Sequence, residues 1–157
     1  MNNNKILLDQ INLFEKDNIN SKFYAITFIA NTLSLIYNSF EDINWIGIYL
    51  LENENLVLGP FLGEPACTFI KKGKGVCGKC IEDEEMIIVN DVNKFDGHIA
   101  CDALSKSEIV IPIKKDGKIV FVLDIDSKVI NYFDEDKIDL IINISEKIEQ
   151  ALKKRAI

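Results

Sequence analysis

The residues best suited to chemistry are four cysteines gathered in the middle of the chain: Cys67, Cys77, Cys80 and Cys101. The N-terminal segment lacks the continuous apolar stretch of a secretory signal, and no run approaches the roughly 20 apolar residues that span a bilayer. We therefore expect a cytoplasmic protein that does not enter membranes. In reducing surroundings, clustered cysteines are more often redox-active or metal-bound than permanently bridged.

Zinc binding is one interpretation of the cysteine cluster. The cysteines and the single histidine, His98, offer enough ligands, and Cys77 and Cys80 form one CxxC pair. The second pair expected of a structural zinc site is missing, so we predict no bound metal. A zinc-stabilised interaction domain remains the alternative. His98 lies three residues before Cys101 and either orients that thiol or is simply exposed in a loop.

Three acids form a second group: Glu108, Asp124 and Asp126. If Lys114 pairs with Lys118 across a three-residue loop, Glu108 lies opposite Asp124, and all three acids share one face of the sheet because side chains alternate along a strand. A loop of even length would instead place Glu108 on the far side. Acids among apolar neighbours are costly to bury unless they meet a cation, a metal or a proton. Hydrogen bonding to local backbone at the strand end is the alternative.

The thiols and the acids work against each other, since nearby negative charge raises a thiol pKa and depletes the thiolate. A small zwitterionic or cationic ligand with a reducible centre would relieve the conflict, and a protonated carboxyl group could deliver a proton to it. Trp45 and Tyr49 point to one face of an expected strand with Gly47 between them. This spacing predicts a hollow for a small apolar or sulfur-containing group, with plain core packing as the alternative.

Periodicity predicts the elements that carry these residues. Leu7, Ile11 and Phe14 mark a first helix. A second helix has an apolar stripe of Phe23, Ile26, Ala30, Leu33 and Tyr37, with Phe28 and Leu35 outside it. Because this helix is apolar on more than one side, it needs a second surface, either a subunit interface or the first helix.

Strands are expected at 43–51, 56–61, 109–113 and 119–126, and a C-terminal helix at 134–154. The loop-rich stretch 62–107 holds every cysteine, with a short helix at 76–82 and a short strand at 86–89. This order predicts one α+β domain over residues 1–157, an antiparallel sheet flanked by N-terminal helices and a C-terminal helix.

Net charge and glycine pattern exclude two classes of ligand. The chain carries 18 basic and 25 acidic side chains, a net charge of −7, which disfavours nucleic acid. We expect the local lysines to be solvated: Lys71, Lys72, Lys74 and Lys79. The run 73–78 matches GxGxxG but does not follow a strand in a parallel βαβ unit, so we interpret it as a tight loop around Cys77 and not as a dinucleotide site.

Several segments, in order, closely resemble the free methionine-(R)-sulfoxide reductases, which are single-domain enzymes of the GAF fold. They are NWIGIYLL (44–51), LGPFLGEPAC (58–67), GKGVCG (73–78), VNDVNKFDGHIACD (89–102), SEIVIPI (107–113) and VLDIDS (122–127). The resemblance implies a GAF-like sheet and reduction of the R-sulfoxide of free methionine, a repair of oxidative damage, without a cofactor.

Site residues follow from the same resemblance. Cys101 resembles the nucleophile, Cys67 its resolving partner and Cys77 an auxiliary thiol that can also form a disulfide. Trp45 and Tyr49 are similar to residues that wall the substrate pocket, and the acids Glu108, Asp124 and Asp126 to those that hold substrate and supply protons. The implied cycle passes through a sulfenic acid on Cys101 and a disulfide to Cys67, reduced by a thioredoxin-like protein. A homodimer is also expected.

Cys80 departs from the family pattern. It is either a passive residue of the short helix or a relay that pairs with Cys77 and carries the disulfide outward. A GAF-type sensory module that binds a small ligand without reacting is the second functional class, and the zinc-stabilised domain is the third.

Overall fold

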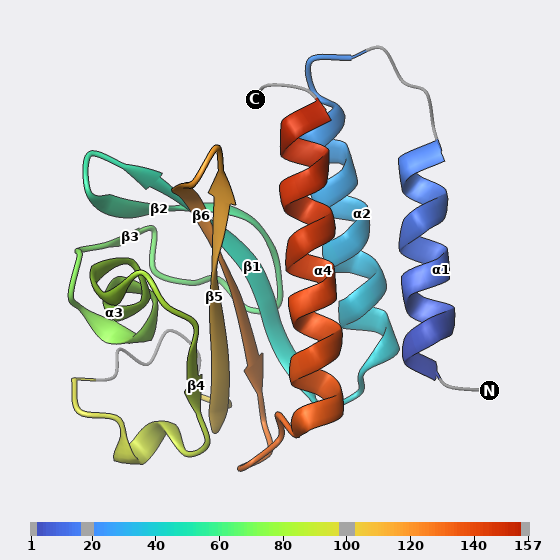
Figure 1. The fold of residues 1–157 in the computed structure, drawn as a ribbon. Helices are drawn as coiled ribbons and strands as arrows, with labels where there is room; N and C mark the ends of the chain where they lie inside the picture. Colours follow the sequence, from blue (N-terminus) through green and yellow to red (C-terminus); the bar gives the residue numbers. More distant parts are fainter. Residues whose placement is uncertain (1–2, 17–20, 98–102, 155–157) are drawn as a thin grey trace.

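The computed structural model describes residues 3–16, 21–97 and 103–154 (Figure 1). Within these ranges one six-stranded antiparallel sheet has the order β3-β2-β1-β6-β5-β4. Its strands are β1 (Ile43–Glu52), β2 (Asn55–Leu62), β3 (Phe69–Ile70), β4 (Ile87–Val89), β5 (Ser107–Lys115) and β6 (Lys118–Ser127). The helices are α1 (Asn3–Lys16), α2 (Tyr24–Ser39), α3 (Gly75–Asp83), α4 (Glu135–Lys154) and the 3₁₀ turn η1 (Val92–Lys94). The predicted α+β antiparallel architecture is confirmed.

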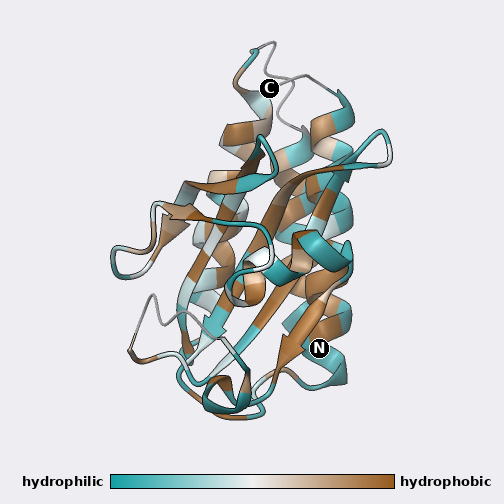
Figure 2. Ribbon diagram, turned by 90° about the vertical axis from the view of Figure 1, so that its left-hand side faces the viewer, coloured by the Kyte–Doolittle hydropathy of each residue, from teal (hydrophilic) through white to brown (hydrophobic). Residues whose placement is uncertain are grey.

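The two faces of the sheet are covered differently. Helices α2 and α4 pack on one face, and α1 packs outside them (Figure 1). On β6, Leu123 and Ile125 join this helical core, whereas Val122 belongs to a second, smaller core that also holds Trp45 and Tyr49. Figure 2 looks onto the second face, where α3 lies across apolar strands. Strand alternation thus divides each central strand between a face that α2 and α4 cover and a face that α3 covers.

The predicted stripe of α2 is wrong. Of its five members only Leu33 is fully buried, while Phe23 and Ile26 are 59% and 41% exposed. The buried apolar residues of the helix are Tyr24, Ala25, Phe28, Ile29, Leu33 and Ile36. Apolar residues surround this helix, so periodicity allows more than one face, and packing against the sheet and α4 selects the buried one. Helix α1 supplies a second surface, with Leu7 and Ile11 buried in the same core.

The β5–β6 hairpin differs from the predicted register in two ways, and their effects on which face of the sheet Glu108 occupies cancel. Its turn has two residues, Asp116 and Gly117, both with positive φ (52° and 77°), as is typical of tight hairpins. An even turn alone would send Glu108 to the far face. The register then shifts between Ile113 and Lys114, where β6 contains one extra residue, and this β-bulge restores the original face.

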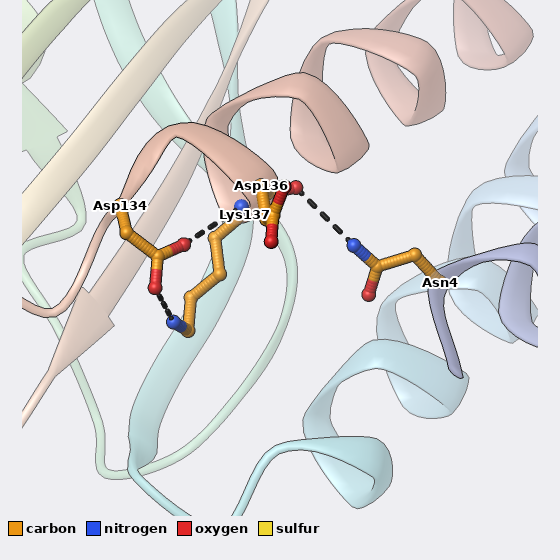
Figure 3. Close-up of polar contacts among 4 residues, drawn as sticks. All are labelled: Asn4, Asp134, Asp136 and Lys137. Atoms are coloured by element: carbon orange, nitrogen blue, oxygen red, sulfur yellow. Dashed lines mark hydrogen bonds and ion pairs between the residues drawn. The ribbon is translucent and has the colours of Figure 1, made fainter. Parts of the chain in front are cut away.

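Helix α4 begins with a side-chain cap and a tie to α1 (Figure 3). The Asp134 carboxylate accepts the Lys137 backbone N–H at 3.0 Å and also pairs with the Lys137 ammonium group. The Asn4 side-chain amide donates to the Asp136 carbonyl at 3.3 Å. The Asp134 contact satisfies a backbone N–H that the start of a helix leaves without a partner, and the Asn4 contact ties α1 to the first turn of α4. None of the helices in the described ranges is long and apolar enough to cross a membrane.

Removing the cap tests how far α4 supports the sheet. Asp134→Ala should lower the free energy of unfolding by about 1 kcal/mol, because the first turn loses its acceptor. Urea denaturation followed by far-UV circular dichroism measures this difference. Asp139→Ala, at an exposed position of the same helix, is the matched control and should shift the midpoint much less. Equal effects of the two substitutions would contradict the capping role.

Candidate functional site

Strand register brings the acids and the aromatic pair onto one face. On β1, Trp45 lies opposite Asp126 and Gly47 opposite Asp124. On β5, Glu108 lies opposite Asp126, not opposite Asp124 as predicted. The offset is two residues, so side-chain alternation keeps all three acids on the face that α3 covers. The predicted acidic patch is therefore present, with a different pairing.

Two of the acids are buried and hydrogen-bonded to each other. Glu108 and Asp124 are each only 6% exposed, and their side chains share a hydrogen bond. Burial raises the pKa of Glu108 well above its ordinary value, and the negative charge of Asp126 raises it further. Burial and Glu108 together raise the pKa of Asp124 in the same direction. The pair therefore retains protons at a pH where an exposed carboxyl group has lost them.

Helix α3 places a thiol against this pair. The Cys77 Sγ donates a hydrogen bond to Asp124 Oδ2 at 3.2 Å, while Asp124 Oδ1 is buried with no hydrogen-bond partner among the described residues. Burial, followed by the charge of Asp124, raises the pKa of the Cys77 thiol well above its ordinary value. Cys77 is therefore a protonated thiol and a poor nucleophile.

The same three side chains are the group within the described ranges that comes nearest to a metal centre. Cys77, Glu108 and Asp124 each offer one ligand atom, all within 4.8 Å of one another. Metal ligation requires the deprotonated forms of these groups. Their raised pKa values favour protons, so the arrangement suits proton sharing better than metal binding. Cys80 is absent from the group, which argues against the CxxC pair as a zinc ligand set.

The glycine-rich run forms the tight turn that holds α3 in place. Gly73 has φ of +74°, and its N–H donates to the Gly78 carbonyl at 2.8 Å. A Cβ atom on Gly78 would lie 2.4 Å from the Lys71 carbonyl oxygen, so only glycine fits there. Because the sheet is antiparallel, the run is not part of a dinucleotide fold. Within this run the predicted tight loop is confined to Gly73 and Lys74, whereas Cys77 lies within α3 (Gly75–Asp83).

An aromatic stack occupies the surface next to the acids. The Trp45 ring lies between Tyr49, at a centroid distance of 5.9 Å, and Phe61, at 5.5 Å. A Cβ atom on Gly47 would lie 2.4 Å from Trp45 Cη2. The predicted hollow over Gly47 is therefore wrong, because the indole folds back along its own strand and fills that space.

Tyr49 and Phe61 are the two other members of the aromatic stack. Tyr49 is 1% exposed, and burial, followed by the charge of Asp124, raises its pKa, so its phenol stays protonated. Sequence reasoning missed Phe61. It pairs directly with Gly47 across β1 and β2, and an aromatic residue facing a strand glycine is the signal that would have identified it.

The remaining cysteines have distinct environments. Cys67 is disulfide-bonded and partly buried in the segment between β2 and β3, whereas Cys77 and Cys80 are free thiols. Cys80 is fully buried, with Sγ 4.0 Å from the Val110 carbonyl, and burial raises its pKa to about 12. This environment supports a passive role for Cys80. Cys101 and His98 lie outside the described residues.

The lysines around the glycine-rich run are solvated as expected. Lys71, Lys72 and Lys74 are exposed, and Lys79 pairs with Glu82 at 2.7 Å and with Asp83 at 3.1 Å on the outer side of α3. Lys79, the lysine nearest to Cys77 in sequence, is thus already paired with acidic side chains of its own helix.

Comparison with known proteins identifies relatives of this arrangement. Residues 28–153 match the GAF domain. The chain is 46% identical over 150 residues to Protein YtsP of Bacillus subtilis, covering 94% of this chain and 90% of the relative. It is 53% identical over 110 residues to the free methionine-R-sulfoxide reductase of Escherichia coli, covering 69% and 67%.

A solved structure extends the similarity to almost the whole chain. The fRMsr of Staphylococcus aureus in its reduced form superposes with a TM-score of 0.86 at 44% identity, covering 96% of this chain and 95% of that one. Its complex with substrate gives a TM-score of 0.85 at 43% identity with the same coverage. The chain therefore belongs to the free methionine-R-sulfoxide reductase family and is built on the GAF domain.

Proposed function

We propose that this protein reduces the R-sulfoxide of free methionine to methionine. The observation that carries the proposal is the hydrogen-bonded pair Glu108 and Asp124, whose raised pKa values make it a source of protons on a buried face. Reduction of a sulfoxide requires protonation of its oxygen, and a carboxyl group retained in the acid form can supply that proton. The family membership supports the same reaction.

The chemistry balances as a two-electron exchange at sulfur. The Cys101 thiolate attacks the sulfoxide sulfur while a carboxyl group protonates the oxygen; methionine leaves, and the oxygen remains on Cys101 as a sulfenic acid. The Cys67 thiol then displaces this oxygen as water and forms a disulfide. An external dithiol returns both cysteines to thiols and is itself oxidised to a disulfide.

The state of the described cysteines supports this cycle. Cys67 is disulfide-bonded while Cys77 and Cys80 are free thiols, so Cys67 is the described cysteine that takes part in disulfide chemistry. In this proposal Cys77 is an auxiliary thiol that acts through Asp124, to which it donates a hydrogen bond. From the family resemblance, the proposal also assigns Trp45 and Tyr49 to the wall of the substrate pocket and Asp126, which pairs with Trp45 across the strands, to its acidic side.

The reductant, the cellular compartment and the oligomeric state are also part of this proposal. A thioredoxin-like protein is a suitable reductant, because the disulfide needs a dithiol that can reach a partly exposed sulfur, and the cytoplasm maintains such reductants. The surface of α2 that carries the exposed Phe23 and Ile26 is available for a homodimer contact. The enzyme would then repair the oxidised pool of free methionine.

Loss of the nucleophile is the direct test. Cys101→Ser should reduce turnover of free methionine-R-sulfoxide with dithiothreitol to background, because an alcohol cannot replace the thiolate. Cys80→Ala is the matched control and should keep turnover, since the Cys80 sulfur lies against the Val110 carbonyl, whereas the thiol that donates to Asp124 is that of Cys77. Methionine release from each sulfoxide epimer, and from a blocked peptide sulfoxide, measures both activity and specificity.

Three outcomes would contradict the proposal. One is an absence of methionine release by the reduced wild-type protein. Equal activity of Cys101→Ser is the second. The third is a preference for the S epimer or for the peptide. A ligand that binds while the thiols remain unreacted would instead favour the sensory module.

The protonated acids also predict a pH dependence of stability. Because the pKa of Asp124 is higher in the folded state, this carboxyl contributes stability that is complete below its unfolded pKa and is lost as pH rises toward the folded value. Asp124→Asn removes that titration. The variant should therefore gain stability relative to wild type between pH 5 and pH 8, as measured by urea midpoints of the reduced proteins.

Asp139→Asn, at an exposed site of α4, is the control for this measurement and should follow wild type at both pH values. If the stability difference between wild type and Asp124→Asn were the same at pH 5 and pH 8, the Asp124 carboxyl group would not be held in the acid form.

A further inference from the structure

The segment from Gly63 to Thr68 carries Cys67 and has no helix or strand of its own. Individual contacts must therefore fix its position. Under the function proposed above, the Cys67 thiol has to reach a sulfenic acid, and a disulfide forms only when the two Cα atoms lie about 4.4–6.8 Å apart. A small displacement of the segment would slow this step, because intramolecular reactions depend steeply on alignment.

Hydrogen bonds hold this segment on either side of Cys67. The Trp45 indole Nε1–H donates to the Glu64 carbonyl at 3.0 Å, three residues before the cysteine. The Leu58 backbone N–H donates to the Thr68 carbonyl at 3.1 Å, one residue after it. Pro65 lies between these points, and its ring restricts the backbone further.

Gly63 brings the segment against the same indole. Its φ is +124°, and a Cβ atom there would lie 2.7 Å from Trp45 Cδ1 and 2.6 Å from the Asn44 carbonyl oxygen. Any larger residue would push the chain away from Trp45 as it leaves β2. The indole in turn has little freedom, since it is 2% exposed and stacked between Tyr49 and Phe61.

We propose that Trp45 and Gly63 are positioning residues for the resolving step, in which Cys67 condenses with the sulfenic acid. Trp45 acts through its indole N–H on Glu64, and Gly63 acts by permitting close approach to the ring. One aromatic side chain then serves both half-reactions, as a wall for the substrate and as an anchor for the resolving thiol. The inference rests on the proposed function.

A single-turnover experiment separates the two half-reactions. Reduced protein is mixed with one equivalent of free methionine-R-sulfoxide and quenched at intervals. Chromatography measures methionine, and intact mass after dimedone and alkylation measures sulfenic acid and disulfide. Trp45→Phe keeps an aromatic ring but removes the N–H, and it should slow disulfide formation, relative to methionine formation, roughly fivefold. Gly63→Ala should slow it about tenfold or more and should accumulate sulfenic acid.

Gly117→Ala is the matched control, because Gly117 also has positive φ (+77°) but a Cβ atom there meets nothing within 4 Å. It reports the effect of backbone strain alone. The ratio of the rate of disulfide formation to the rate of methionine formation should stay unchanged. Disulfide formation at the wild-type ratio in both Trp45→Phe and Gly63→Ala would overturn the inference. Trp45→Phe keeps the test decisive if Gly63→Ala does not fold.

A second arm distinguishes failure of this inference from failure of the proposed function. Hydrogen peroxide replaces methionine sulfoxide as the oxidant that converts the thiol to a sulfenic acid. If wild type releases no methionine, the proposed function fails, but slower disulfide formation in the two variants after peroxide still supports the positioning role. If wild type releases methionine and the variants form the disulfide normally with either oxidant, only the positioning role fails.

Discussion

Burial of two carboxyl groups that share a hydrogen bond is the constraint on which the rest of the site depends. Glu108 and Asp124 lie where charged acids would be costly, and the cost is avoided because they keep protons. The Cys77 thiol donates to Asp124 of this pair, and burial, followed by the charge of Asp124, raises its pKa and keeps it neutral. The buried pair can therefore hold protons beside the negative charge of Asp126, which suits a group that donates a proton to a bound ligand.

The buried acids can lie in the sheet because its two faces differ: one carries the main apolar core, and the other carries the candidate site. The face toward α2 and α4 holds a continuous apolar core that supplies most of the buried surface. Among the described residues, α3 and connecting segments cover the opposite face, and its core is smaller, so polar side chains can be inserted there with less loss of packing (Figure 2). Gly78 lets the preceding loop pack closely against α3, the helix that presents Cys77 to Asp124.

Much of this was predictable from sequence, and the failures have physical causes. Strand alternation correctly placed Glu108, Asp124 and Asp126 on one face, and the glycine-rich run was correctly separated from dinucleotide binding. The buried face of α2 was predicted wrongly because its apolar residues fit more than one helical stripe. The space over Gly47 was predicted to be empty because spacing cannot show how a long indole folds back on its own strand. The roles of Cys101 and Cys67 came from family resemblance, since no periodicity distinguishes one loop thiol from another.

The bulge in β6 has a consequence for how this enzyme family can vary in length. The face that Glu108 occupies depends on the sum of the turn length and the extra residue near Val120, although both lie at the opposite end of the hairpin. Gain or loss of one residue there would rotate every side chain of β5 by half a turn and send the acid into the helical core. Natural insertions in this hairpin should therefore come in pairs, or be balanced by a compensating bulge.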